Sequence, residues 1–171
     1  MMDIGKQFDM GIQNANSIIY NNQLNSLVAY CRKLVNEILP KQREYKNQTG
    51  NTVTSYSFGI YYGGRIVYIG SNGLKDPVRA KLQKGEKWSG VNYDGLETDL
   101  YGTIDTDGGY GENTAKRFLN SYKPTTNSFA VVITTGTEYS SYLENKHHLN
   151  VLSDSFETVS SDLINSFIPI K

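Results

Sequence analysis

The stretch from Thr52 to Gly70, TVTSYSFGIYYGGRIVYIG, constrains the fold of this chain more than any other. It contains two runs rich in Val, Ile, Tyr and Phe, the residues that favour strands. Gly63 and Gly64 lie between the runs, and a tight two-residue hairpin turn needs backbone with positive φ at both of its positions. The stretch therefore predicts an antiparallel β-hairpin around which the other elements are arranged.

A long amphipathic helix is predicted before the hairpin. From Gln23 onward, apolar residues recur at spacings of three and four, which is the pattern of a helix with one buried face. Pro40 either ends or kinks this helix, and Gly50 is a natural left-handed residue after it. Residues 1–20 are polar with scattered apolar side chains, so they fit either a short helix or an arm that orders only on contact. The apolar stripe consists of Leu24, Leu27, Val28, Cys31, Leu34, Val35, Ile38 and Leu39.

Residues 74–126 form a long insertion after the hairpin. They are rich in Gly, Asp, Asn, Lys and Tyr and lack a periodic apolar pattern. A segment of this length is expected to hold short strands or to contact a neighbour, and residues 112–122 within it can form a short helix. The run 127–135 that follows is continuously apolar, which predicts a strand buried on both faces.

Three further elements are predicted towards the C-terminus. Residues 139–144 fit a turn or two of helix, and residues 147–152 fit a short strand. A final helix is expected after a cap at Asp154 or Ser153, with Phe156 to Phe167 supplying its apolar face, Glu157 completing a capping box with Asp154, and Pro169 ending it. The sequence thus predicts a single α+β domain over residues 1–171, with an N-terminal amphipathic helix, an antiparallel sheet with a long insertion, and a C-terminal helix packed on the sheet.

The charge balance and the cysteine content limit the functions that this chain can have. Lys+Arg and Asp+Glu balance at 17 each, and this lack of a basic excess counts against DNA binding as the main task. The lone Cys31 excludes an internal disulfide and a cysteine-based zinc site, and it fits a small core residue in a reducing compartment. The first residues lack the basic and apolar regions of a signal peptide, and no apolar run has the length of a membrane span. No metal ion or other cofactor is expected.

The chain is rich in tyrosine, with 13 residues among 171. Tyrosine has a large apolar face and a polar tip, so an excess of it suits surfaces that are half buried against partners. Tyrosine also favours ordinary strands, and composition leaves both explanations open.

The two tripeptides Gly59-Ile60-Tyr61 and Tyr68-Ile69-Gly70 resemble the signature of GIY-YIG endonucleases. That resemblance implies divalent-metal-dependent DNA cleavage, with the tripeptides on adjacent antiparallel strands and an arginine on the next helix. Only six residues separate the two tyrosines, and Pro77 interrupts the segment that should carry the arginine, so the nuclease is kept as an alternative. The residues implied for that chemistry are Tyr61, Tyr68, Arg79 and either Glu97 or Glu112.

The succession of segments resembles the head–tail joining and tail-completion proteins of tailed bacteriophages over about residues 24–167. One matching part is the amphipathic helix that ends in Thr49-Gly50-Asn51 and runs into a strand containing serine. The other is a C-terminal block with a Tyr-x-x-Tyr-Leu-Glu segment, a short histidine-containing strand and an Asp-capped helix. Its matching residues are Tyr139, Tyr142, Leu143, Glu144, His148, Val151, Leu152 and Asp154.

The phage resemblance implies a structural virion protein without enzymatic activity. Such a subunit forms a homo-oligomeric ring in the neck or tail, contacts portal, adaptor or tail proteins, and lets DNA pass without sequence readout. It would assemble in the host cytoplasm and contact no membrane. A ring needs two different surfaces on each subunit, which we expect the hairpin and the insertion to supply. A monomeric α+β binding module is a third possibility. The expected interface residues are Tyr56, Tyr61, Tyr62, Arg65, Tyr68, Trp88, Tyr93, Tyr101, Tyr139 and Tyr142.

Overall fold

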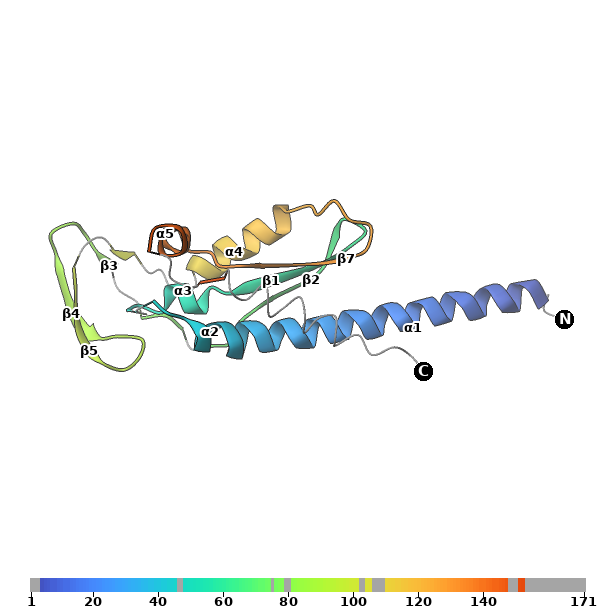
Figure 1. The fold of residues 1–171 in the computed structure, drawn as a ribbon, viewed down its shortest axis with the longest axis horizontal. Helices are drawn as coiled ribbons and strands as arrows, with labels where there is room; N and C mark the ends of the chain where they lie inside the picture. Colours follow the sequence, from blue (N-terminus) through green and yellow to red (C-terminus); the bar gives the residue numbers. More distant parts are fainter. Residues whose placement is uncertain are drawn as a thin grey trace.

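The computed structural model confirms a mixed α+β fold, with a long N-terminal helix and antiparallel sheets (Figure 1). It describes residues 4–45, 48–74, 76–78, 81–101, 104–105, 110–147 and 151–152. The elements are α1 (Ile4–Lys33), η1 (Leu34–Ile38), α2 (Leu39–Gln42), α3 (Asn51–Thr54), β1 (Ser57–Tyr62), β2 (Arg65–Ser71), β3 (Lys81–Leu82), β4 (Lys87–Val91), β5 (Glu97–Tyr101), β6 (Ile104–Asp105), α4 (Tyr110–Ser121), β7 (Phe129–Thr134) and α5 (Glu138–His147).

One continuous helix, α1, begins at Ile4. Of the two alternatives for residues 1–20, a short helix or an arm, residues 4–20 are therefore helical. Only the C-terminal half of α1 packs on the sheet, where Leu27 and Cys31 are buried as the apolar stripe predicts. The N-terminal half projects beyond the sheet and is exposed to solvent (Figure 1).

Pro40 neither ends nor sharply kinks the helix, because a turn of π-helix precedes it. In η1 the N–H of Leu39 donates to the carbonyl of Leu34, five residues earlier. Proline lacks an N–H, and its ring crowds the carbonyl four residues before it, here that of Asn36. The wider π turn accommodates this ring and lets the helix continue to Gln42.

The predicted hairpin is confirmed by the antiparallel pair β1 and β2. Gly63 and Gly64 both have positive φ, 57° and 74°, as a primed turn requires. The strand begins later than expected, however, because residues 51–54 form the helical turn α3. The Thr54 hydroxyl donates to the carbonyl of Gly50 at 2.8 Å, and the Ser55 hydroxyl donates to a carbonyl three residues earlier. Such local hydroxyl bonds favour a turn over a strand.

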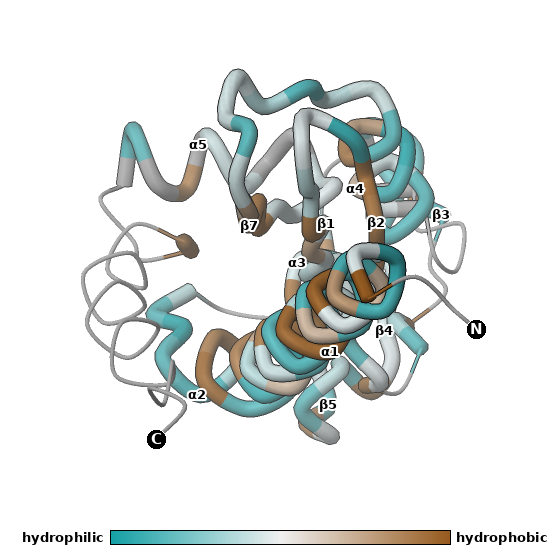
Figure 2. Tube along the Cα trace, turned by 90° about the vertical axis from the view of Figure 1, so that its right-hand side faces the viewer, coloured by the Kyte–Doolittle hydropathy of each residue, from teal (hydrophilic) through white to brown (hydrophobic). Residues whose placement is uncertain are grey.

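The main sheet has the strand order β2-β1-β7, with β7 antiparallel to β1. The predicted strand at 127–135 is confirmed, but its burial on both faces is wrong. Strand β1 is the central and almost fully buried one, whereas β7 is half-buried at a sheet edge within the described chain. Figure 2, viewed along α1, shows the strands between α1 and α4. The domain therefore has three layers, helix, sheet and helix.

The insertion contains short strands and the helix α4, as predicted for 74–126. Strands β4 and β5 form a hairpin at the end of the molecule opposite to the N-terminus (Figure 1). The turn of this hairpin is anchored, since the Tyr93 N–H donates to the carbonyl of Gln48 at 2.9 Å and Arg43 forms a 2.6 Å ion pair with Asp94. The tyrosine ring lies directly on Gly50, where an added Cβ would be 2.1 Å from it.

The C-terminal predictions are only partly met. Helix α5 confirms the helical turn predicted at 139–144 and extends it to His147, because good helix formers such as Leu143 and Lys146 carry the pattern on. The strand predicted at 147–152 is wrong at His147, which is helical, and at Val151 and Leu152, which form a bend. His148 and the helix predicted from Asp154 lie outside the described residues.

Candidate functional site

The tyrosines expected at an assembly interface lie in different environments, and two of them are core residues. Tyr56 and Tyr61 are fully buried. The Tyr56 hydroxyl pairs with that of Tyr45 at 2.8 Å and donates to the carbonyl of Val151 at 3.2 Å. The Tyr61 hydroxyl donates to the carbonyl of Leu119 at 2.6 Å. Both hydroxyls thus have partners inside the chain, and the expectation that these residues face a neighbour is corrected.

Two more of these tyrosines make contacts within the domain. Tyr68 accepts a 2.6 Å hydrogen bond from Arg32 of α1, and its ring stacks on Phe58 with 5.8 Å between centroids. Tyr93 is buried against Gly50. These contacts hold β2 on α1 and anchor the β4–β5 hairpin, so neither ring is presented as a free surface.

Three of the expected interface residues are exposed. Tyr62 at the hairpin tip is 46% exposed and Tyr101 on β5 is 70% exposed, and Arg65 is exposed beside the turn. Trp88 is half-buried, with its ring over Gly90 of the same strand. Tyr139 and Tyr142 lie on α5, with side chains outside the described part. The residues are spread over the hairpin, the insertion and α5 rather than gathered into one patch.

The tripeptide tyrosines do not share a site. The tripeptides do lie on adjacent antiparallel strands, with Gly59 opposite Ile69 and Ile60 opposite Tyr68. Side chains directly opposite each other share a face, and neighbours along a strand alternate. Tyr61 accordingly points to α4 and Tyr68 to α1, on opposite faces of the sheet. Glu97 is exposed on β5, and Arg79 lies outside the described residues.

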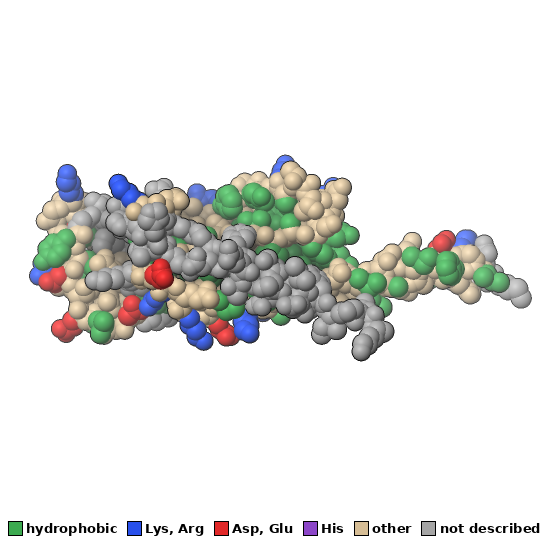
Figure 3. All heavy atoms as spheres, in the orientation of Figure 1, with side chains coloured by type: hydrophobic (Ala, Val, Ile, Leu, Met, Phe, Trp, Pro, Cys, Tyr) green, Lys and Arg blue, Asp and Glu red, His purple; other side chains and the backbone are tan. Residues whose placement is uncertain are grey.

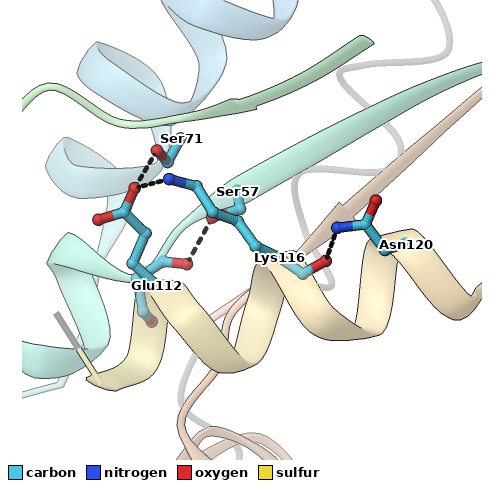
Figure 4. A network of polar contacts seen from close by, with 6 residues as sticks. Ser57, Ser71, Glu112, Lys116 and Asn120 are labelled. Atoms are coloured by element: carbon cyan, nitrogen blue, oxygen red, sulfur yellow. Dashed lines mark hydrogen bonds and ion pairs between the residues drawn. The ribbon is translucent and has the colours of Figure 1, made fainter. Parts of the chain in front are cut away.

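Glu112, the other acidic residue of the nuclease hypothesis, is held in a polar network (Figure 4). One of its carboxylate oxygens accepts a 2.5 Å hydrogen bond from Ser71 of β2 and forms a 2.5 Å ion pair with Lys116, one turn along α4. Burial raises the pKa of the Glu112 carboxyl, but the hydrogen bonds from Lys116 and Ser71 outweigh it and hold the pKa below its ordinary value. The network joins α4 to β2, which is a structural role.

Cys31 is buried in the core, as the apolar stripe predicts. Burial raises the pKa of its thiol to about 12, so it is not a reactive nucleophile at neutral pH. Among the described residues, no cluster of three or more His, Cys, Asp or Glu side chains can hold a metal ion. In that same part of the chain, no helix is both long and apolar enough to span a membrane.

Among the described residues, the longest series of exposed large apolar side chains lies on the projecting half of α1, which the sequence did not single out. Figure 3 shows hydrophobic side chains along this projecting segment. Phe8, for example, is 70% exposed. A helical count from Ile4 instead of Gln23 reveals the pattern, because apolar residues recur there too at spacings of three and four. We call this set the α1 stripe: Ile4, Phe8, Ile12, Ala15, Ile18 and Ile19.

A second exposed apolar surface lies on α4, on the opposite side of the sheet. Phe118 is 45% exposed and Tyr122, just after the helix, is 41% exposed. Their rings contact each other with 5.7 Å between centroids, and we call them the α4 pair.

Comparison of the whole chain with protein-family models, curated proteins and solved structures gave no match.

Proposed function

We propose that this chain is a structural subunit of a head–tail connector, a neck ring of a tailed bacteriophage that joins portal to tail. The observation that carries the proposal is the presence of separate exposed apolar surfaces on opposite layers, the α1 stripe and the α4 pair. A ring with rotational symmetry uses two different surfaces on each subunit, one for each neighbour. An exposed apolar surface of the extent of the α1 stripe often marks an interaction site, and the α4 pair is a smaller apolar surface on the other side of the sheet.

The order of the elements supports the same proposal. The long helix, the left-handed Gly50, a strand containing serine and, after a long middle region, helix α5 occur in the order on which the phage resemblance rests, with the helical turn α3 between Gly50 and the strand. The balance of 17 basic and 17 acidic residues is also consistent, because a subunit that only encloses passing DNA need not bind its phosphates. Other copies of the chain, and portal, adaptor or tail proteins, are the partners in this proposal.

The test is the state of assembly. Purified protein is examined by light scattering coupled to size exclusion and by negative-stain electron microscopy, alone and with portal and tail proteins of the phage. We expect closed rings, and we expect the chain among the proteins of purified virions. A stable monomer at every concentration, which also fails to join portal or tail proteins, contradicts the proposal.

The nuclease alternative has its own experiment. Supercoiled DNA is incubated with the protein and Mg²⁺, and the Arg79→Ala variant is run beside it. We expect no cleavage by either protein, since Tyr61 and Tyr68 point to opposite faces of the sheet. Mg²⁺-dependent cleavage that is lost in Arg79→Ala would replace the structural proposal by the enzymatic one.

A further inference from the structure

Helix α1 carries two apolar stripes on nearly opposite faces. Successive residues of an α-helix are about 100° apart around its axis. By that count, the centre of the α1 stripe lies about 160° from the centre of the core-facing residues Leu24, Leu27, Val28 and Cys31. The core-facing residues lie against the sheet, and Leu27 and Cys31 are buried. The α1 stripe therefore faces away from its own domain and cannot be covered by an extension of the same sheet.

The N-terminal half of α1 also lacks the features of a helix that stands alone in water. Between residues 4 and 22 the only charged side chains are Lys6 and Asp9, so few ion pairs can support it. The segment contains two glycines and four asparagines, which are poor helix formers. Most helical stability in proteins comes from packing of an apolar face, and here that face is unpaired in the isolated chain.

Gly11 lies inside the α1 stripe and has no role in the packing of the isolated chain. A Cβ added at this position would meet no atom within 4 Å. A glycine inside a helix is destabilising relative to alanine. Residue 11 neither needs positive φ nor is crowded, so the presence of glycine there has another reason. Gly11 and Ala15, one turn apart, have no side chain beyond Cβ, so they leave a shallow notch on the helix surface between Phe8 and Ile18.

The α4 pair supplies such side chains on the other outer layer of the same chain. Phe118 and Tyr122 are four residues apart and each is partly exposed, and the Tyr122 ring also packs on the buried Tyr61 with 5.8 Å between ring centroids. The α1 stripe contains no charged side chain, so it favours an apolar partner, and the two rings of the α4 pair provide one between Arg117 and Lys123. The two surfaces lie on opposite sides of the three-layer domain, which is the arrangement needed for head-to-tail contact between copies.

We infer that the α1 stripe of one copy packs on the α4 pair of the next copy, with the aromatic rings at the Gly11 notch. The inference deepens the proposed function. It rests on the part of that proposal in which copies of the chain assemble with one another, and it does not require that the assembly belongs to a virion. The occupant of the stripe is thus a second copy of this chain.

The stripe supplies much of the area that a stable contact needs on one partner. Taking roughly 200 Å² for a fully exposed side chain of this size, the five large residues of the stripe expose on the order of 600 Å². A stable interface buries about 800 Å² on each partner, of which the apolar core is a large part. Flanking polar residues of α1 and α4 would supply the remainder.

The first test measures the mass of the full chain in solution. The double variant Phe8→Lys, Ile18→Lys places two charges in the stripe without touching the core. We expect it to raise the dissociation constant between copies at least ~100-fold, because each side chain of this size favours association by one to two factors of ten. Met10→Lys is the matched control, since Met10 is exposed on another face of the same helix segment, and we expect no change of mass.

The second test identifies the receiving surface by cross-linking. Gly11→Cys and Tyr122→Cys proteins are prepared separately, mixed, and treated with a short bis-maleimide, to which the buried Cys31 is inert. We expect cross-linked dimers in the mixture and not in either protein alone. Equal cross-linking of Gly11→Cys alone would show that two α1 segments meet each other instead, and no cross-link in the mixture would also overturn the inference.

The two proposals can fail separately. If wild-type protein forms rings whose mass is unchanged in the Phe8→Lys, Ile18→Lys variant, the inference is wrong and the neck-ring proposal stands. If the mixed cross-link forms but the copies build open filaments instead of rings, the inference stands and the neck ring is wrong.

Discussion

The hydroxyl of Tyr61 on β1 donates a 2.6 Å hydrogen bond to the backbone carbonyl of Leu119 on α4. The last four carbonyls of a helix have no partner within the helix, and that of Leu119 is one of them. A side chain of the central strand therefore provides a hydrogen-bond donor for a carbonyl in the last turn of the helix that covers the strand. Burial raises the pKa of the Tyr61 phenol, which keeps the hydroxyl a donor at neutral pH.

Tyr61→Phe should lower the free energy of unfolding by about 1 kcal/mol, because it removes this bond and leaves the ring in place. Tyr61→Ala should cost about 3 to 5 kcal/mol through the cavity that it leaves. Both values come from urea denaturation. Tyr62→Phe, next in the strand but exposed, is the control, and an equal loss in Tyr61→Phe and Tyr62→Phe would contradict the prediction.

Gly136→Ala should destabilise the fold by about 2 kcal/mol or more. An added Cβ at Gly136 would lie 1.6 Å from the carbonyl oxygen of Gly111, so the N-terminal turn of α4 would have to move away from the segment after β7. Gly73→Ala is the matched control, since its Cβ would find the nearest atom at an ordinary 3.8 Å. A thermal melt in which the two variants shift alike would refute the close approach.

Glu112 should make stability depend on pH below neutrality. Its pKa is lower in the folded chain than in the unfolded chain, so its ionised form stabilises the fold above the unfolded value near 4.5. That contribution should be lost as the pH falls through the lowered folded value. The free energy of unfolding, measured by urea denaturation between pH 7 and pH 3, should change less with pH in Glu112→Gln than in the exposed Glu97→Gln. Identical slopes would show that the Ser71–Glu112–Lys116 network does not act in solution.

Cys31 should resist thiol reagents in the folded protein and react fully in urea. Its raised pKa of about 12 also has a thermodynamic consequence. The unfolded thiol ionises near its ordinary 9.0 while the folded thiol remains protonated, so the stabilising contribution present below pH 9 is lost as the pH rises towards 12. Reaction with a chromogenic disulfide at pH 8 measures the first effect. Rapid labelling of native protein would mean that the α1 core opens readily.

The parts of the fold that follow from local chemistry were predictable from the sequence. Gly63 and Gly64 fix the hairpin turn, and the stripe from Leu24 to Leu39 fixes the core side of α1, because each depends on a short-range rule. Helix α3 was missed since hydroxyl bonds to neighbouring carbonyls compete with a strand pattern. The burial of β7 was overestimated, as an apolar run does not reveal whether a strand is central or at an edge.

The candidate site was harder to predict. Tyrosine composition left open whether these rings lie at partner surfaces or in ordinary strands. The Tyr56 and Tyr61 hydroxyls find partners inside the chain, and only the tertiary structure brings Val151 and Leu119 to them. The α1 stripe was readable from spacing alone, but its significance depends on the face that the sheet covers. That Phe118 faces outward while Leu119 is buried depends likewise on the placement of α4 against the sheet.

The contact of Tyr93 with Gly50 makes two distant positions of the chain depend on each other. A side chain at residue 50, on the backbone as it stands with φ of 87°, would occupy the place of the ring. Among descendants of this sequence, an aromatic residue at 93 should therefore be inherited together with glycine at 50. Lineages that lose the β4–β5 hairpin should be free to replace that glycine by asparagine, the other residue that tolerates a left-handed backbone.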